Sequence, residues 1–139
     1  MKDMLDKRTL DGVAHHGDAA TAKYYEKLRE RKLQTTRCDV CGEIAFPPRD
    51  FCPECPSRKT SWVDLPTKGT LYAFTQQDRS VRFMTPEVVG IVELEGVGRI
   101  FTHIKAKIED LSIGDPVELE FVEVSEALVL HAFKPIPAD

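Results

Sequence analysis

The chain holds four cysteines, arranged as two Cys-x-x-Cys pairs with ten residues between the pairs: Cys38, Cys41, Cys52 and Cys55. Each pair can fold into a tight knuckle that directs two thiolates at one point, and two knuckles complete a tetrahedral site of four sulfurs. Gly42 follows the first pair, where a knuckle favours a residue with positive φ, and Pro53 stiffens the second pair. The spacing therefore predicts one metal site that uses all four cysteines.

Zinc is the metal that we expect in this site, and its expected role is structural. Four thiolates fill the coordination shell, whereas catalytic zinc keeps three protein ligands and an open position. Iron suits the same four sulfurs and is the alternative metal. Two disulfides or free thiols are the other interpretations. Because the sequence shows no secretory signal, we expect a cytoplasmic, reducing setting, in which this spacing favours a metal over disulfides.

The distribution of charge along the chain bears on whether nucleic acid is a partner. The 139-residue chain has a formal net charge of −4. Residues 23–62 carry nine basic and six acidic groups, whereas residues 66–139 carry seven basic and twelve acidic groups. A nucleic-acid-binding protein concentrates positive charge on its contact face, so nucleic acid is not the expected partner. We also expect no membrane partner, because no apolar run is long enough to span a bilayer.

Periodicity and turn residues divide the chain into four segments: a loose N-terminal segment over 1–17, a helix over 18–34, a zinc ribbon over 35–66 and a barrel over 67–139. The helix is predicted from apolar residues at helical spacing, which are Ala22, Tyr25, Leu28 and Leu33. Basic residues gather toward its C-terminal end, where they suit the helix dipole. We expect the apolar stripe to pack on the core of the protein.

Five segments of the C-terminal half have the composition and alternation of β-strands: Thr70–Gln76, Val88–Glu95, Arg99–Lys105, Val117–Glu123 and Leu128–Phe133. Five antiparallel strands in so short a stretch favour a closed barrel, because closure removes exposed edges. We expect an OB-fold barrel, with an SH3-like barrel as the alternative. The predicted fold is thus mainly β, with an N-terminal helix, a rubredoxin-like zinc ribbon and a five-stranded OB-fold barrel.

This order of elements resembles a specific family, the zinc-ribbon OB-fold proteins associated with acyl-CoA metabolism, long catalogued as a domain of unknown function. The matching stretches are YYEKLRERKLQTTRCDVCGEIAFPPRDFCPEC, KGTLYAFTQ, PEVVGIVELE and LSIGDPVELEF. The resemblance covers about Tyr24 to Pro135, and the run from Cys41 through Phe46-Pro47-Pro48-Arg49 to Pro53 is its most specific part. One departure is Pro56, where members of the family often carry glycine.

The resemblance implies an accessory role without catalysis. Members of the family bind thiolases, acyl-CoA dehydratases or hydroxymethylglutaryl-CoA synthase, and are thought to bridge such enzymes or to help hold the acyl-CoA. The expected partners are therefore an acyl-CoA or other CoA ester and a thiolase-like or other acyl-CoA enzyme. The sequence itself contains no paired nucleophile and base and no phosphate-cradling glycine loop, so we expect no enzyme activity.

A CoA ester needs cations for its phosphates and apolar groups for its acyl arm and adenine. Residues 77–86 form a long predicted loop with both kinds of group, and further arginines flank the helix and the ribbon. The candidate ligand-binding residues are Arg29, Arg37, Arg49, Arg79, Arg82, Phe83 and Met84. The alternative function is a module that binds single-stranded nucleic acid, because zinc ribbons and OB-folds also do this work.

Overall fold

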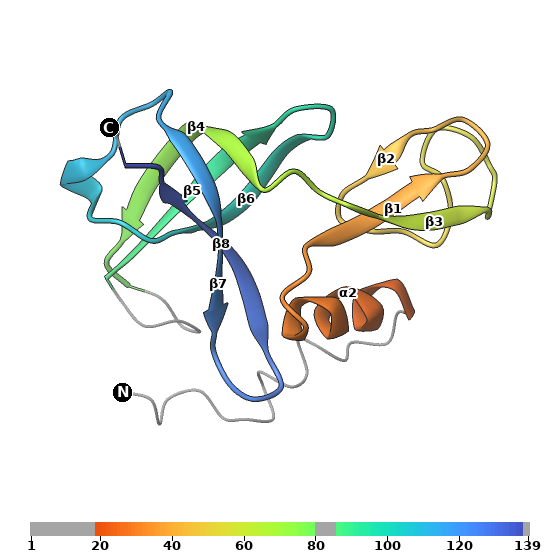
Figure 1. Ribbon diagram of the computed structural model, residues 1–139, viewed down its shortest axis with the longest axis horizontal. Helices are drawn as coiled ribbons and strands as arrows, with labels where there is room; N and C mark the ends of the chain where they lie inside the picture. The colour runs from red at the N-terminus through yellow and green to blue at the C-terminus, as the bar shows by residue number, and fades with distance from the viewer. Residues whose placement is uncertain (1–18, 80–85, 138–139) are drawn as a thin grey trace.

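The computed structural model describes residues 19–79 and 86–137 and combines one helix, a small sheet and a closed barrel (Figure 1). The elements follow one another in this order: α2 (Ala19–Arg29), β1 (Gln34–Cys38), β2 (Ile44–Ala45), β3 (Thr60–Asp64), β4 (Lys68–Gln77), β5 (Glu87–Leu94), β6 (Gly98–Ile104), the 3₁₀ turn η2 (Ile108–Asp110), β7 (Pro116–Glu123) and β8 (Val129–Pro135). The loose segment predicted over 1–17 lies outside the described residues.

The ribbon is a three-stranded antiparallel sheet in the order β2-β1-β3. Its central strand β1 pairs Thr36 with Ala45 of β2 on one side and with Trp62 of β3 on the other. The β1–β2 connection lies at the end of β1 that carries Cys38, and the long β2–β3 connection returns to this end, where Thr60 of β3 pairs with Cys38 (Figure 1). The first Cys-x-x-Cys pair spans the end of β1 and the β1–β2 connection, and the second pair lies in the β2–β3 connection. The sheet therefore holds the two cysteine pairs next to each other.

The barrel closes in the order β4-β5-β6-β8-β7, and β7 pairs with β4. Because β8 lies between β6 and β7 rather than at the end of a simple meander, the topology is the Greek-key order of an OB-fold, as predicted. One expectation was wrong: the five strands are not all antiparallel, since β6 and β8 pair in parallel through His103–Ala132 and Ile104–Phe133. This parallel pair also separates the fold from the SH3-like alternative, in which neighbouring strands run antiparallel.

Helix α2 is shorter than predicted and ends at Arg29 instead of residue 34. Arg31 takes a left-handed conformation with φ 61°. Its N–H donates to the Leu28 carbonyl at 2.9 Å, and the N–H of Lys32 donates to the Lys27 carbonyl at 2.9 Å. These two bonds form a Schellman motif, which ends the helix although arginine stands at the position where glycine is usual.

The buried face of α2 also differs from the predicted stripe. Ala20, Tyr24 and Leu28 are its buried residues, whereas Tyr25 is half-buried. Tyr24 and Leu28 belong to the same apolar cluster as Phe133 of the barrel, and the helix contacts both β8 and β1. The helix thus packs on the core, as expected, and touches both the barrel and the ribbon (Figure 1). Within the described residues, the helix is too short to cross a membrane.

Candidate metal centre and a pocket on the barrel

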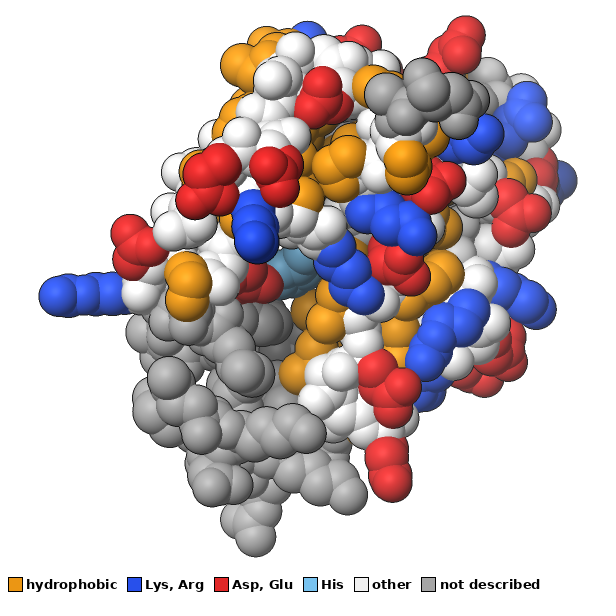
Figure 2. Space-filling model, turned by 60° about the vertical axis from the view of Figure 1, so that its left-hand side comes forward, with side chains coloured by type: hydrophobic (Ala, Val, Ile, Leu, Met, Phe, Trp, Pro, Cys, Tyr) orange, Lys and Arg blue, Asp and Glu red, His pale blue; other side chains and the backbone are white. Residues whose placement is uncertain are grey.

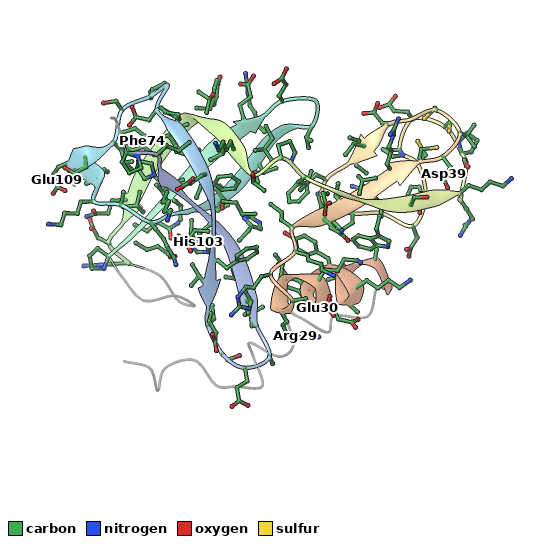
Figure 3. All side chains as sticks on the ribbon, in the orientation of Figure 1. Arg29, Glu30, Asp39, Phe74, His103 and Glu109 are labelled. Carbon is green, nitrogen blue, oxygen red and sulfur yellow. The ribbon has the colours of Figure 1, made fainter. Side chains whose placement is uncertain are left out.

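The four cysteines predicted as ligands converge at the loop end of the ribbon, where Figure 3 shows their sulfur atoms in yellow. All four Sγ atoms lie within 4.8 Å of one another. The Sγ atoms of Cys38 and Cys55 are 3.6 Å apart, and those of Cys41 and Cys52 are 3.4 Å apart. Disulfide sulfurs lie only about 2.05 Å apart, so these are free thiol groups.

The donor set fits a tetrahedral metal ion. Metal–sulfur bonds of about 2.3 Å give sulfur–sulfur edges of about 3.8 Å, close to the spacings found here. Cys38 and Cys52 are buried and Cys41 is exposed. Four converging sulfurs leave no open coordination position, so the chemistry of the site is that of a structural centre. Zinc and iron both accept this set.

Both knuckles have the same backbone closure. The N–H of Cys38 donates to the Glu43 carbonyl at 2.8 Å, and the N–H of Cys52 donates to the Ser57 carbonyl at 2.9 Å, five residues on in each case. Gly42 takes the positive φ expected of it, 81°. Pro56 stands at the matching position of the second knuckle, and the same hydrogen bond closes that turn without glycine.

The first cysteine of each pair also accepts backbone hydrogen bonds at sulfur. The N–H groups of Val40 and Cys41 both lie 3.4 Å from the Sγ of Cys38. The N–H group of Cys55 makes the same contact with the Sγ of Cys52. The hydrogen bond from the Cys41 N–H is the largest of the effects that lower the pKa of Cys38, to about 6. This hydrogen bond favours the thiolate of Cys38, the form in which cysteine binds metals.

Hydrogen bonds within the ribbon hold the loops that carry the cysteines. The hydroxyl of Thr35, which is fully buried, donates to the Ala45 carbonyl. The hydroxyl of Thr36 accepts a hydrogen bond of 2.9 Å from the N–H of Arg49, in the long β2–β3 connection. The metal centre is therefore supported by the small sheet rather than by a large apolar core of its own.

The structure does not bring the candidate ligand-binding arginines together. The Arg29 guanidinium donates to the Ala127 carbonyl in the β7–β8 turn at 3.0 Å, whereas that of Arg37 donates to the Gly42 carbonyl in the first knuckle at 3.3 Å. Arg49 is exposed on the ribbon and Arg79 is exposed just after β4. The other three candidates, Arg82, Phe83 and Met84, lie outside the described residues. A ligand-binding role for all seven stays a prediction.

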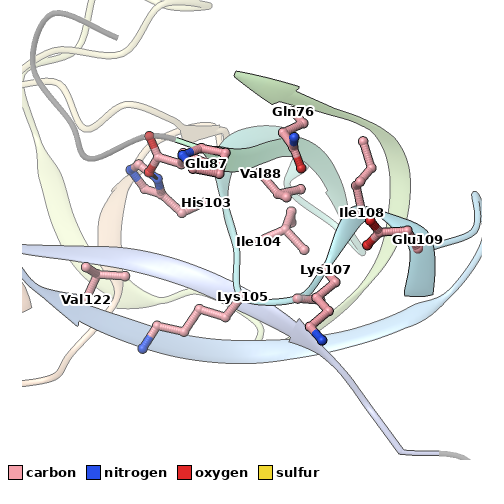
Figure 4. A pocket seen from close by; sticks show the side chains of 12 residues that line it. Gln76, Glu87, Val88, His103, Ile104, Lys105, Lys107, Ile108, Glu109 and Val122 are labelled. Atoms are coloured by element: carbon pink, nitrogen blue, oxygen red, sulfur yellow. Dashed lines mark ion pairs between the residues drawn. The ribbon is translucent and has the colours of Figure 1, made fainter. Parts of the chain in front are cut away.

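A hollow of about 660 Å³ lies on the barrel where β5 begins and β6 ends. Figure 4 shows the Glu87 carboxylate beside the His103 ring in its wall, and the structure pairs the two side chains. The Oε2 atom of Glu87 is buried and has no hydrogen-bond partner among the described residues. Lys105 and Lys107 also line the hollow, together with apolar side chains such as Ile108. The wall thus offers two cations and apolar surface, whereas the unpaired Glu87 oxygen is covered by the protein.

The sequence analysis did not find this hollow. Glu87 and His103 come together because β5 and β6 pair with Val89 opposite His103. Strand alternation places each side chain on a face, but the register that joins the strands is set by their pairing. The pair of lysines just after β6, Lys105 and Lys107, is the sequence feature that points to this hollow.

His131 marks the contact between the barrel and the ribbon. Its Nδ1 lies 2.8 Å from the Thr102 hydroxyl oxygen, and its ring lies edge-on to Phe46, with centroids 6.2 Å apart. The Phe46 ring in turn lies edge-on to the Tyr24 ring of α2, with ring centroids 6.1 Å apart. Burial lowers the pKa of His131 to about 4, and the nearby His103 adds to the shift. His131 is therefore a neutral structural histidine.

Residues 26–122 match two neighbouring family descriptions. Residues 26–61 match "ChsH2, rubredoxin-like zinc ribbon domain" and residues 62–122 match "ChsH2, C-terminal OB-fold domain". The solved structure titled "Ltp2-ChsH2(DUF35) aldolase" contains a chain with the same fold, at a TM-score of 0.77 and 28% identity over 87% of this chain and 98% of that one.

Three relatives illustrate the sequence match, one named as a scaffold protein and two named as subunits of enzymes. A "DUF35 domain-containing scaffold protein" of Methanocaldococcus jannaschii is 34% identical over 78% of this chain and 82% of its own length. The "Probable enoyl-CoA hydratase alpha subunit" of Thermomonospora curvata is 31% identical over 82% of this chain, which spans only 37% of that relative. The "Benzoylsuccinyl-CoA thiolase subunit BbsA" of Thauera aromatica is 32% identical over 63% of this chain and 61% of its own. By fold, motif and sequence, the chain belongs to the DUF35 family of proteins that join a ChsH2-type zinc ribbon to an OB-fold domain.

Proposed function

We propose that this protein is a non-catalytic accessory subunit that binds a CoA ester and bridges acyl-CoA-processing enzymes such as a thiolase or hydroxymethylglutaryl-CoA synthase. One observation carries the proposal. The same ribbon and barrel make up most of a scaffold protein, but only 37% of a hydratase subunit and 61% of a thiolase subunit. The unit shared by these proteins is best explained as the part that holds an assembly together.

The metal in this proposal is one zinc ion held by all four cysteines, with iron as the alternative. Support comes from the converging sulfurs and from the match to a rubredoxin-like zinc ribbon. The ion's work is to fold the ribbon, because a sheet of three short strands buries too little apolar surface to be stable alone. Four thiolates must stay reduced, which is why we place the protein in the cytoplasm.

The proposed CoA-binding region is the hollow on the barrel. Lys105 and Lys107 would attract the phosphates of CoA, and the apolar wall would contact the acyl-pantetheine arm. Arg79 and the other loop residues predicted from the sequence follow β4, whose Gln76 lines the same hollow.

Nucleic acid is the less favoured ligand. The barrel half carries an excess of acidic groups, and on the face seen in Figure 2 acidic and basic side chains are interspersed. A binder of single strands needs a positively charged groove along which the backbone can run. Gel shifts with oligonucleotides that appear at low salt and fade as salt is added would favour this alternative.

Thermal unfolding tests the CoA part of the proposal. CoA and acetyl-CoA should each raise the melting temperature of the isolated chain, and 3′,5′-ADP, which keeps the adenosine and two of the three phosphates but lacks the pantetheine arm, should raise it less. Lys107→Glu should reduce the shift, whereas the control Lys68→Glu, at an exposed position at the start of β4, should not. If no CoA ester shifts the melting temperature, this chain does not bind CoA by itself.

A further inference from the structure

The outward face of β4, β5 and β6 carries an apolar strip that the core does not use. Strand pairing aligns Ala73 with Ile91 and Ile91 with Phe101, so that these three side chains form one row across the sheet. Tyr72 lies beside this row at the bulge in β4. These four residues, which we term the outer strip, are absent from the apolar cluster that fills the barrel.

The strip is exposed where its largest side chains lie. Phe101 is 64% exposed and Tyr72 is 43% exposed, although both belong to paired strands of a closed barrel. The Arg99 guanidinium lies over the Tyr72 ring, with Cζ 3.7 Å from the ring centroid. This stacking orders both side chains before any partner arrives. Tyrosine and arginine are also among the residue types enriched at the positions that contribute most energy to protein interfaces.

Charged pairs border the strip at both ends. Arg99 and Glu93 form an ion pair of 3.4 Å at one end, and Glu87 pairs with His103 at the other. An apolar centre with a polar border is the usual anatomy of a protein–protein interface. Glu95, exposed at the β5–β6 turn, adds a further acidic group to this border.

We propose that the outer strip is the surface on which this protein docks the acyl-CoA enzyme subunit, at a patch of that enzyme with an apolar centre and a basic border. The inference rests on the proposed function and assigns the contact to the barrel. A second copy of this chain fits less well, because it would bring the same acidic border and the same excess of acidic groups to the contact. A chain of the same fold stands in an assembly titled an aldolase, together with a different protein.

Capture from the native cell extract, followed by identification of the captured proteins by mass spectrometry, tests this docking surface. The tagged wild-type chain and Phe101→Leu, which keeps an apolar side chain, should both capture an acyl-CoA enzyme subunit. Phe101→Asp should capture about tenfold less of the same subunit. Melting temperatures of the purified variants check the fold, and Phe101→Ser replaces the aspartate variant if that variant unfolds.

Three other results are possible, and each leads to a different conclusion about the outer strip and the proposed function. If Phe101→Asp captures as much enzyme as the wild type, the outer strip is not the docking surface, while the accessory role stands. If the wild-type chain captures no acyl-CoA enzyme, the proposed function fails and this inference fails with it. If light scattering shows that the isolated wild type is a dimer that Phe101→Asp converts to a monomer, the strip joins two copies and the inference is overturned.

Discussion

The Sγ atom of Cys41 lies 3.4 Å from that of Cys52, although the two residues belong to different loops and different Cys-x-x-Cys pairs. Contact across the two knuckles is what a single metal centre requires, because neither pair alone supplies four ligands. The ribbon can form this contact only when its three strands are paired. Metal binding and folding of the ribbon are therefore coupled.

Elemental analysis should find one zinc ion for each chain, and removal of that ion should unfold the ribbon. Structural zinc contributes about 10–16 kcal/mol of apparent binding free energy in finger peptides, which exceeds the stability of most small domains. Trp62, the only tryptophan, lies in β3, so its fluorescence reports on the ribbon directly. A strong chelator should shift its emission toward that of exposed tryptophan. An unchanged spectrum in metal-free protein would contradict a structural role for the ion.

Two substitutions of Arg31 test whether the left-handed conformation of this residue ends α2. Arg31→Gly and Arg31→Val both lose the ion pair with Glu123 and the hydrogen bond to the Arg29 carbonyl, so the difference between them isolates the backbone. Valine at φ 61° should make the protein less stable than glycine there by about 1–2 kcal/mol. Urea unfolding of the two variants measures this difference. Equal stability would mean that the helix ends in another way.

A substitution of Gly90 tests how closely β4 approaches β5 at this position. A Cβ atom at this position would lie 2.7 Å from the Ala73 carbonyl oxygen and 3.1 Å from Cγ1 of Ile104. Because the first obstacle is backbone, Gly90→Ala should reduce the free energy of unfolding by about 1–3 kcal/mol. The control Thr70→Ala, at an exposed position of β4, should change the free energy of unfolding by about 0.5 kcal/mol or less. Similar losses for both variants would argue against the close approach.

Burial of His131 predicts how stability depends on pH. The folded pKa, about 4, lies below the ordinary value of 6.5, so between these values the unfolded chain binds a proton that the folded chain does not. Stability should therefore fall as pH falls, by about 2 kcal/mol between about pH 7 and pH 5 from this residue alone. No loss from this residue is expected above about pH 7.

Comparison with His131→Asn isolates this effect, since acidic groups and cysteines elsewhere titrate alike in both proteins. Urea unfolding at several pH values should show a shallower loss of stability for the variant. Parallel curves for the two proteins would contradict a buried neutral histidine.

The sequence predicts the fold well because its main signals are local. Two cysteine pairs and clean alternation over β7 (Pro116–Glu123) identify the ribbon and the barrel strands. The parallel pairing of β6 with β8 depends on strand order, which alternation does not encode. The end of α2 was missed because Arg31, not glycine, takes the left-handed conformation.

The binding surfaces are less accessible from sequence than the metal site. Arg29 and Arg37 look alike as cations, but each is hydrogen-bonded to a backbone carbonyl in a different part of the molecule. The pair of Glu87 with His103 exists only because β5 and β6 meet in one register. Such groups are brought together by tertiary structure, so spacing along the chain gives no sign of them.

Steady-state turnover of an acyl-CoA substrate tests the accessory role most directly. Three samples are needed: the isolated chain with its metal, the captured acyl-CoA enzyme alone, and the two recombined in equal amounts. We expect no turnover by the isolated chain and more turnover by the recombined pair than by the enzyme alone. Turnover by the isolated chain would contradict the accessory role.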